Sequence, residues 1–421
     1  MKLLSRGTDL LHNTIYNVLD GGFFGFGFGF ASFSTVLPLF VSNLTDSAVL
    51  IGLVPAIHTM GWQLPQLWIA QKISRMARFK PAVLIATTQE RLPYLGLAIV
   101  AWLLPSIGAK LGLALTFFLL VWQGLGAGIT ANPWQNMIAK VIPANVRATF
   151  FGLQSGAANL LASLGAIAAG LILERWTTSS GFALCFLAAF VMMIISFVCL
   201  MQTREEKRPH EELTAYQVPL YEQAKAILRA DANFRLFLVS RLLTQFSFMG
   251  LAFYMVYAVK KLGMSEADAG VLTSILMLSQ VIANPILGRM ADLWSRKSVL
   301  EVGAIAIVMS AIFAWLAKSF IWFLPVVILA GIANTAYWTI GLALTLEFGS
   351  ENERPTYVGL ANTLVVPGTI VAPLLGGWLA DQWGFESTFI VAAAIGVVTV
   401  VILHWVRDPV VKSYDVVEEV A

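Results

Sequence analysis

The amino-acid sequence predicts an all-α membrane protein with twelve transmembrane helices in two pseudo-symmetric six-helix bundles. Composition is the first observation that predicts this class: 58% of the 421 residues are hydrophobic and only 12% are charged. A soluble protein carries about a quarter charged residues, and its folded surface must be largely polar. The mean hydropathy of +0.77 therefore indicates that most of this chain faces lipid.

Twelve long apolar segments are the second observation, and each is near or above the roughly 20 residues that a helix needs to cross a bilayer. They cover residues 19–42, 48–70, 82–105, 111–139, 148–173, 181–202, 233–259, 266–290, 298–317, 321–346, 356–380 and 385–406. The longest connection, 203–232, is charged and separates an N-terminal half (1–202) from a C-terminal half (233–421). Its apolar residues at positions 220, 224, 227 and 228 share one helical face, which predicts a short interfacial helix.

A weak internal repeat is the third observation. A shift of 207 residues places 124–176 over 331–383 without a gap. The identical pairs include Gly124/Gly331, Asn145/Asn352, Arg147/Arg354, Thr149/Thr356, Gly152/Gly359, Leu153/Leu360, Gly170/Gly377 and Trp176/Trp383. These pairs occupy the same place in each half, and repeated halves are typical of transporters with a site near the middle of the membrane.

Lysine and arginine predict the orientation. The two termini and the even-numbered connections, with the adjoining ends of the spans, hold 20 of the 27 basic residues, whereas the odd-numbered connections hold 5. Basic residues concentrate in cytoplasmic loops. We therefore expect a multi-pass protein of the cell membrane with both termini and the 203–232 connection in the cytoplasm.

The run DGGFFGFGFGF at residues 20–30 alternates with a period of two, which by itself would favour a β-strand. A lone strand cannot cross lipid, because its backbone polar groups would have no partners. On a helix, Gly21, Gly25 and Gly29 share one face, and small residues at this spacing let two helices approach closely. Static packing and a contact that changes during function are both open interpretations of this face.

The connection after the eighth span carries a motif. Gly288, Asp292, Arg296 and Lys297 follow the pattern G-x-x-x-D-x-x-x-R-K, which resembles the signature loop of the major facilitator superfamily. The resemblance covers the whole chain and implies a twelve-helix fold in which the acid pairs with basic groups to hold the cytoplasmic face shut. The alternative is that the basic residues only set the topology.

The eleventh span contains a second motif of that superfamily. Pro373, Gly376 and Gly377 resemble the G-P-x-x-G-G pattern of its antiporters, although those carry it in the fifth span. The fourth span carries Gln123 and Gly124, as in the R-x-x-Q-G motif of proton-coupled drug exporters, but Leu120 replaces the arginine. No subfamily follows from these motifs.

Charged residues within spans are costly and mark functional candidates. Asp20 lies in the first span and Arg241 in the seventh, and the alternatives for them are a pair across the two halves or separate snorkelling to the interface. Glu90 and Arg91 lie near the middle of the third span, about 12 Å past its start. Glu90 is the candidate for proton coupling and Arg91 for an anchor or anion contact, and the alternative is a static polar cluster beside Pro93.

Spans 1, 4, 7 and 10 line the central cavity in proteins of that superfamily, as the resemblance implies. The polar and aromatic residues of spans 4, 7 and 10 are therefore candidates for contact with the solute: Asn132, Trp134, Gln135, Asn136, Gln245, Asn334, Tyr337 and Trp338. Aromatic faces combined with amides suit a neutral or amphipathic solute. For the tryptophans, a belt at the lipid interface is the alternative.

The sequence offers little support for an enzyme. It has no phosphate-binding loop and no nucleophile elbow, and its four histidines lack the spacing of metal ligands. We expect no cofactor, no metal and, from the net charge of +3, no nucleic-acid partner.

The resulting hypothesis is a monomeric secondary transporter that moves a small solute by alternating access, with H+ or Na+ as candidate coupling ions. A proton-coupled multidrug or sugar exporter is one alternative, and a transporter-like receptor or scaffold without flux is another.

Overall fold

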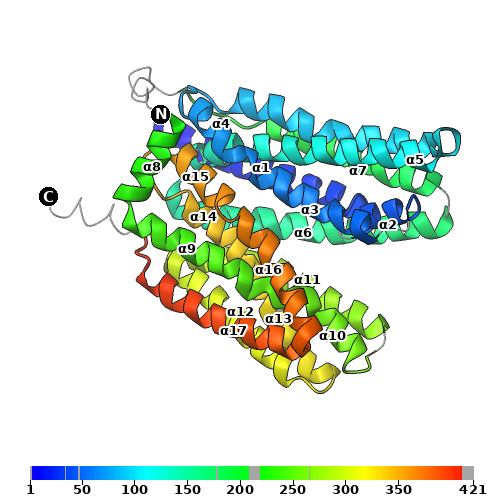
Figure 1. The fold of residues 1–421 in the computed structure, drawn as a ribbon. Coiled ribbons are helices and arrows are strands. Elements are labelled where there is room, and N and C mark those ends of the chain that lie inside the picture. Colours follow the sequence, from blue (N-terminus) through cyan, green and yellow to red (C-terminus); the bar gives the residue numbers. More distant parts are fainter. Residues whose placement is uncertain are drawn as a thin grey trace. The chain divides into compact units, whose positions relative to one another are not determined.

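The computed structural model describes residues 2–33, 35–45, 48–176, 179–207, 219–264 and 266–409, and these residues are almost entirely helical (Figure 1). Their contacts divide the chain into two units, which we describe separately. Unit 1 comprises residues 1–143, 157–217 and 351–359, and unit 2 comprises residues 144–156, 218–350 and 360–421.

Unit 1 is built from the helices of the first six predicted spans. These are α1 (Lys2–Phe30), α2 (Val36–Ser42), α3 (Ala48–Gln63), α4 (Pro65–Ser74), α5 (Lys80–Val141), α6 (Ala144–Arg175, from residue 157 onward) and α7 (Ser179–Met201). α5 contains both the third and the fourth span, and the chain turns between them at Gly108, where a φ of 77° favours glycine. The run DGGFFGFGFGF lies within α1, so the helical interpretation of that run is confirmed.

Unit 2 contains the remaining helices and the first turns of α6. They are α8 (Leu220–Ala230), α9 (Ala232–Ser247), η2 (Phe248–Phe253), α10 (Tyr254–Lys260), α11 (Glu266–Leu293), α12 (Arg296–Leu316), α13 (Phe320–Thr335), the π-helical turn η3 (Ala336–Ile340), α14 (Gly341–Thr345), α15 (Arg354–Thr363, with residues 354–359 in unit 1), α16 (Val366–Trp383) and α17 (Phe385–Trp405). α8 is the short helix predicted within the connection; residues 208–218 of that connection lie outside the described residues.

Nine helices of the described part are long and apolar enough to cross a membrane, and α5 is one of them although it holds two spans. Several other spans are divided into consecutive helices. α3 and α4 together form the second span, and α4 begins at Pro65, whose nitrogen cannot donate a helical hydrogen bond. The twelve predicted spans are therefore present, but some continuous helices contain two spans and some spans consist of two helices.

The same neighbour pattern recurs in each unit. In unit 1, α7 packs against α1 and α5, and α3 packs against α5. In unit 2, α17 packs against α9 and α12, and α11 packs against α13. Numbered by span, these contacts are 1 with 6, 3 with 6 and 2 with 4 in the first half, and 7 with 12, 9 with 12 and 8 with 10 in the second. The predicted repeat of the sequence is thus a repeat of helix packing.

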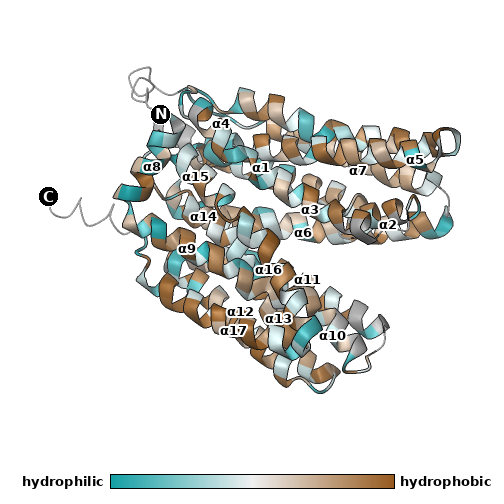
Figure 2. Ribbon diagram, in the orientation of Figure 1, coloured by the Kyte–Doolittle hydropathy of each residue, from teal (hydrophilic) through white to brown (hydrophobic). Residues whose placement is uncertain are grey.

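The outer helix faces are apolar, as Figure 2 shows along α17. α7 exposes a stripe of large apolar side chains at alternating spacings of three and four residues: Leu184, Leu187, Val191, Ile194, Val198 and Met201. Such a continuous apolar face is unfavourable in water and suits lipid. The protein is therefore a multi-pass membrane protein.

Candidate functional site

A cluster of three buried charges lies within unit 1, where α1, α5 and α7 meet. Asp20, Glu90 and Arg91 are only 5%, 7% and 4% exposed. The Arg91 guanidinium lies 3.3 Å from an Asp20 carboxylate oxygen and 3.8 Å from a Glu90 carboxylate oxygen. Two acids and one base thus share one buried site.

Neutral groups of α7 complete this cluster. Arg91 donates to the Ser196 hydroxyl at 2.7 Å and to the Met193 carbonyl at 3.0 Å. The Ser196 hydroxyl in turn donates to Asp20 at 2.6 Å. Glu90 accepts a hydrogen bond from Thr87 at the longer distance of 3.4 Å. The ring of Phe24 lies 5.1 Å from the centre of the guanidinium.

Asp20 and Arg241 each have partners within their own unit. Asp20 pairs with Arg91, and its low exposure excludes snorkelling to the interface. Arg241, which is 7% exposed, also stays buried, within unit 2. The sequence could not show this, because the partner of Asp20 lies 71 positions away on another helix.

Arg241 is surrounded by neutral groups. It donates to the Thr345 hydroxyl at 3.0 Å and to the Asn362 amide oxygen at 3.4 Å. The rings of Phe237 and Tyr337 lie 5.8 and 5.6 Å from the guanidinium carbon. Each such cation–π contact stabilises by about 0.5–2 kcal/mol, less than the several kcal/mol that burying an ion costs. Among the residues that the structure describes, no carboxylate lies within ion-pair distance of Arg241.

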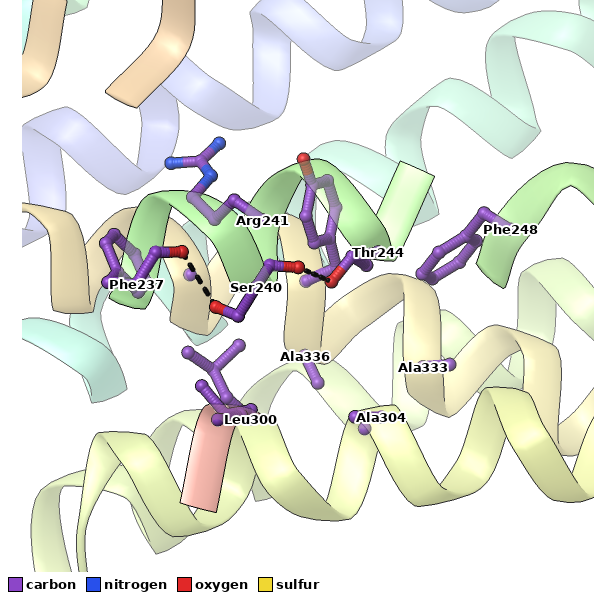
Figure 3. Close-up of a pocket in the computed structure, with 13 residues that line it drawn as sticks. Phe237, Ser240, Arg241, Thr244, Phe248, Leu300, Ala304, Ala333 and Ala336 are labelled. Carbon is purple, nitrogen blue, oxygen red and sulfur yellow. Dashed lines mark hydrogen bonds between the residues drawn. The ribbon is translucent and has the colours of Figure 1, made fainter. Parts of the chain in front are cut away.

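A small cavity of about 30 Å³ lies beside Arg241 in unit 2 (Figure 3). Its lining includes Ser240, Thr244, Leu300 and Ala304. The hydroxyls of Ser240 and Thr244 both donate to carbonyls of their own helix. The cavity has room for a water molecule and is too small for a sugar or a drug.

The predicted solute contacts fall into two groups. In unit 1, Asn132 donates to the carbonyls of Gln66 and Pro355, and Asn136 donates back to Asn132. Gln135 is 1% exposed, and neither of its amide atoms has a partner within the described part of the chain. Trp134 is half-buried.

The second group lies in unit 2. Gln245 donates to the Tyr337 hydroxyl, Asn334 is half-buried, and Trp338 is 43% exposed. Tyr337 and Trp338 both belong to the π-helical turn η3, a kind of distortion that is frequent at functional sites. Tyr337 thereby joins Gln245 to Arg241, an association that the sequence did not reveal.

The motif after the eighth span is also within unit 2. Asp292 accepts hydrogen bonds from Arg296 at 2.9 Å and from the backbone N–H groups of Ala148 and Thr149 at 3.1 and 2.5 Å. A Cβ at Gly288 would lie 2.5 Å from the Ala148 carbonyl oxygen, so only glycine permits this approach. Lys297 instead donates to the His404 carbonyl and pairs with Glu301.

The predicted packing glycines differ in what they touch. A Cβ at Gly25 would lie 2.3 Å from the Ala158 carbonyl oxygen, and one at Gly29 2.3 Å from that of Ala162. Gly21 is half-exposed. In α16, Pro373 is exposed, whereas Gly376 and Gly377 face the Phe253 side chain.

Three known proteins resemble this chain in sequence or in structure. The chain is 30% identical over 158 residues to the multidrug resistance protein MdtG of Dickeya zeae, a match that covers 35% of this chain and 38% of the length of MdtG. The structure resembles that of the Escherichia coli fucose:proton symporter FucP (TM-score 0.76, 12% identity), covering 94% of this chain and 99% of FucP. It also resembles that of the proton:xylose symporter XylE (TM-score 0.73, 16% identity), covering 96% and 97% of the two chains.

The two structural likenesses establish the fold. The family model described as Major Facilitator Superfamily matches residues 90–259 and 237–419, which is most of the chain. The chain therefore belongs to the Major Facilitator Superfamily.

Proposed function

We propose that this protein is a secondary active transporter that moves a small solute across the cell membrane by alternating access, driven by a proton gradient. The halves 1–202 and 233–421 would be the two bodies that move against each other. The buried cluster of Asp20, Glu90 and Arg91 is the observation that supports proton coupling.

The charges of that cluster favour an exchangeable proton. Two carboxylates and one guanidinium sum to one negative charge, and a buried net charge needs compensation. Arginine stays protonated, so the proton must come and go on a carboxylate. Asp20 is held at 3.3 Å by Arg91 and at 2.6 Å by Ser196, whereas Glu90 lies 3.8 Å from Arg91. Glu90 is therefore the carboxylate that exchanges the proton, and Asp20 positions Arg91.

Glu90→Gln tests this role, because glutamine keeps the shape of the side chain but cannot titrate. In proteoliposomes, accumulation driven by a pH gradient should collapse, while exchange of solute across the membrane survives. Asp20→Asn is the matched control, and it should impair both. Accumulation by Glu90→Gln at the wild-type level would show that Glu90 is structural. Accumulation by the wild type under a Na+ gradient alone would show that the coupling ion is Na+ rather than H+.

The proposed orientation places both termini and α8 in the cytoplasm, which follows from the bias of basic residues. A cysteine at the exposed position Glu222 should not react with a membrane-impermeant thiol label in intact cells. A cysteine at the exposed position Lys318, in an odd-numbered connection, should react. The unsubstituted chain, with Cys185 buried and Cys199 half-buried, provides the background. The reverse labelling pattern would invert the orientation.

A multidrug exporter is the second candidate, because the chain matches MdtG over part of its length. The superfamily's drug-exporter arginine is replaced by Leu120 here, which disfavours this assignment. Export of ethidium from cells that express the protein would support it. A receptor or scaffold without flux is the remaining alternative, and binding of a solute without its transport in proteoliposomes would favour it.

We propose that the monomer is the working unit.

A further inference from the structure

Arg241 is a buried cation that has no carboxylate within ion-pair distance among the residues that the structure describes. It is 7% exposed, as deeply buried as the charges of unit 1. Arg91 has two carboxylates within 4 Å, but the hydrogen-bond acceptors of Arg241 in the described structure are one hydroxyl and one amide oxygen. A buried charge of this kind is stable when an anion accompanies it.

The geometry of the guanidinium indicates which anion. The Nε–H of Arg241 is buried and has no hydrogen-bond partner in the described part of the chain, where each terminal nitrogen donates one hydrogen bond to a neutral oxygen. Arginine therefore has unused donors in the planar fork that matches a carboxylate with two parallel hydrogen bonds. Figure 3 shows the guanidinium on the side of α9 opposite Leu300 and Ala304.

The neighbouring side chains narrow the chemistry further. A single guanidinium balances one negative charge, whereas a phosphate group carries more than one near neutral pH. The rings of Phe237 and Tyr337 flank the guanidinium, and the ring of Phe248 lies 5.7 Å from that of Tyr337. These faces suit an apolar or aromatic body attached to the charged group.

We infer that Arg241 is the binding site for a carboxylate group of the transported solute, which is an amphipathic monocarboxylate. The inference rests on the proposed transport function, because it names the class of solute. Tyr337 and Gln245, which are joined by a hydrogen bond, position the aromatic wall of the site.

Thermal unfolding of the purified full-length protein tests the site without requiring flux. Acetate, benzoate and nicotinate are each compared with the neutral amide of the same shape at equal ionic strength, and inorganic phosphate forms a separate arm. At least one carboxylate should raise the unfolding temperature while its amide does not, since ligands of the folded state stabilise it. Arg241→Gln should weaken binding of that carboxylate by at least about tenfold, because the loss of even one of the two charge-assisted hydrogen bonds has an effect of this size.

Two further variants keep the test decisive. Arg241→Lys retains the charge but not the planar fork, so it should bind the carboxylate more weakly than the wild type. It takes the place of Arg241→Gln if the glutamine variant fails to fold. Arg235→Gln, at an exposed position on the same helix, should leave the stabilisation unchanged. The inference is overturned if no carboxylate is distinguished from its amide, if phosphate stabilises most, or if the shift persists without Arg241.

Transport is then measured separately with the carboxylate that binds. Binding that depends on Arg241 without uphill flux would refute the transport function and keep the anion site. Uphill flux of a neutral solute that is unaffected by Arg241→Gln would refute the anion site and keep the transport function.

Discussion

Unit 1 and unit 2 each bury an arginine within a predicted span, and the two arginines have different surroundings. Arg91 is enclosed by Asp20, Glu90 and Ser196, so its charge is more than balanced. Arg241 has only neutral acceptors and two aromatic rings in the described structure. The two units thus repeat the same helix packing but surround their arginines differently, which is the basis for proposing a proton site in unit 1 and an anion site in unit 2.

The largest expected effect is a difference in stability between variants of the two arginines. Arg91→Gln leaves Asp20 and Glu90 buried without a cation, which should lower the free energy of unfolding by about 3–5 kcal/mol. Arg241→Gln removes a charge that has no counter-ion among the described residues and should leave thermal stability unchanged or higher in the absence of solute. Unfolding temperatures in detergent provide the measurement. Equal losses in both variants would remove the distinction between the two sites.

The second prediction compares glycines of the two units. A Cβ at Gly25 would meet backbone atoms of Ala158 at 2.3–2.7 Å, and a helix backbone cannot yield locally. A Cβ at Gly376 would meet side chains of Phe253, Met249 and Thr388 at 3.0–3.3 Å, which can rotate. Gly25→Ala should therefore destabilise by roughly 1–3 kcal/mol, the usual range for overpacking, and Gly376→Ala by less.

Gly170→Ala is the control for this comparison, because no atom lies within 4 Å of the added Cβ. Thermal unfolding and transport are measured for all three variants. If Gly25→Ala and Gly170→Ala behave alike in both measurements, α1 and α6 do not need their close contact.

The third prediction concerns an acid of unit 2 that is fully partnered. Asp292 is bonded by Arg296 and by two backbone N–H groups, so Asp292→Asn should cost about 1.5–3 kcal/mol, the range for hydrogen bonds to a charged group. If this loop also holds one face of the transporter shut, the variant changes how readily a cysteine at the adjoining Ala144 is labelled. If stability and labelling are both unchanged, the basic residues of the motif only set the membrane topology.

Glu301→Gln is the matched control for Asp292→Asn. Glu301 pairs with Lys297 at 3.4 Å, and both side chains are about one-fifth exposed. A pair in contact with solvent contributes about 0–1 kcal/mol, so this variant should stay close to the wild type.

The smallest expected effects come from the rings beside the two arginines. Phe24→Leu and Phe237→Leu each remove one cation–π contact, worth about 0.5–2 kcal/mol. The loss should be smaller at Phe24, because carboxylates already compensate Arg91, and larger at Phe237. Chemical unfolding of the two variants under identical conditions measures the difference, and a larger loss at Phe24 would contradict it.

Much of the fold could be predicted from hydropathy and local pattern alone. The twelve apolar segments, the helix within the 203–232 connection and the helical state of DGGFFGFGFGF all follow from local properties. They do so because a membrane offers no hydrogen bonds to the backbone and therefore restricts each apolar segment to a helix. The structure differs in where spans are joined or divided, as at Gly108 and Pro65, because hydropathy does not detect a turn between apolar residues.

The sequence by itself also placed Asp20, Glu90, Arg91 and Arg241 within apolar segments long enough to span a membrane. Only the tertiary structure decided which of them are partners. Asp20 bonds to Arg91 through the packing of α1, α5 and α7, and Tyr337 reaches Arg241 through a π-helical turn. The physical reason is that ion pairing depends on which helix faces meet and how each helix is rotated, whereas burial in lipid depends only on the composition of each segment.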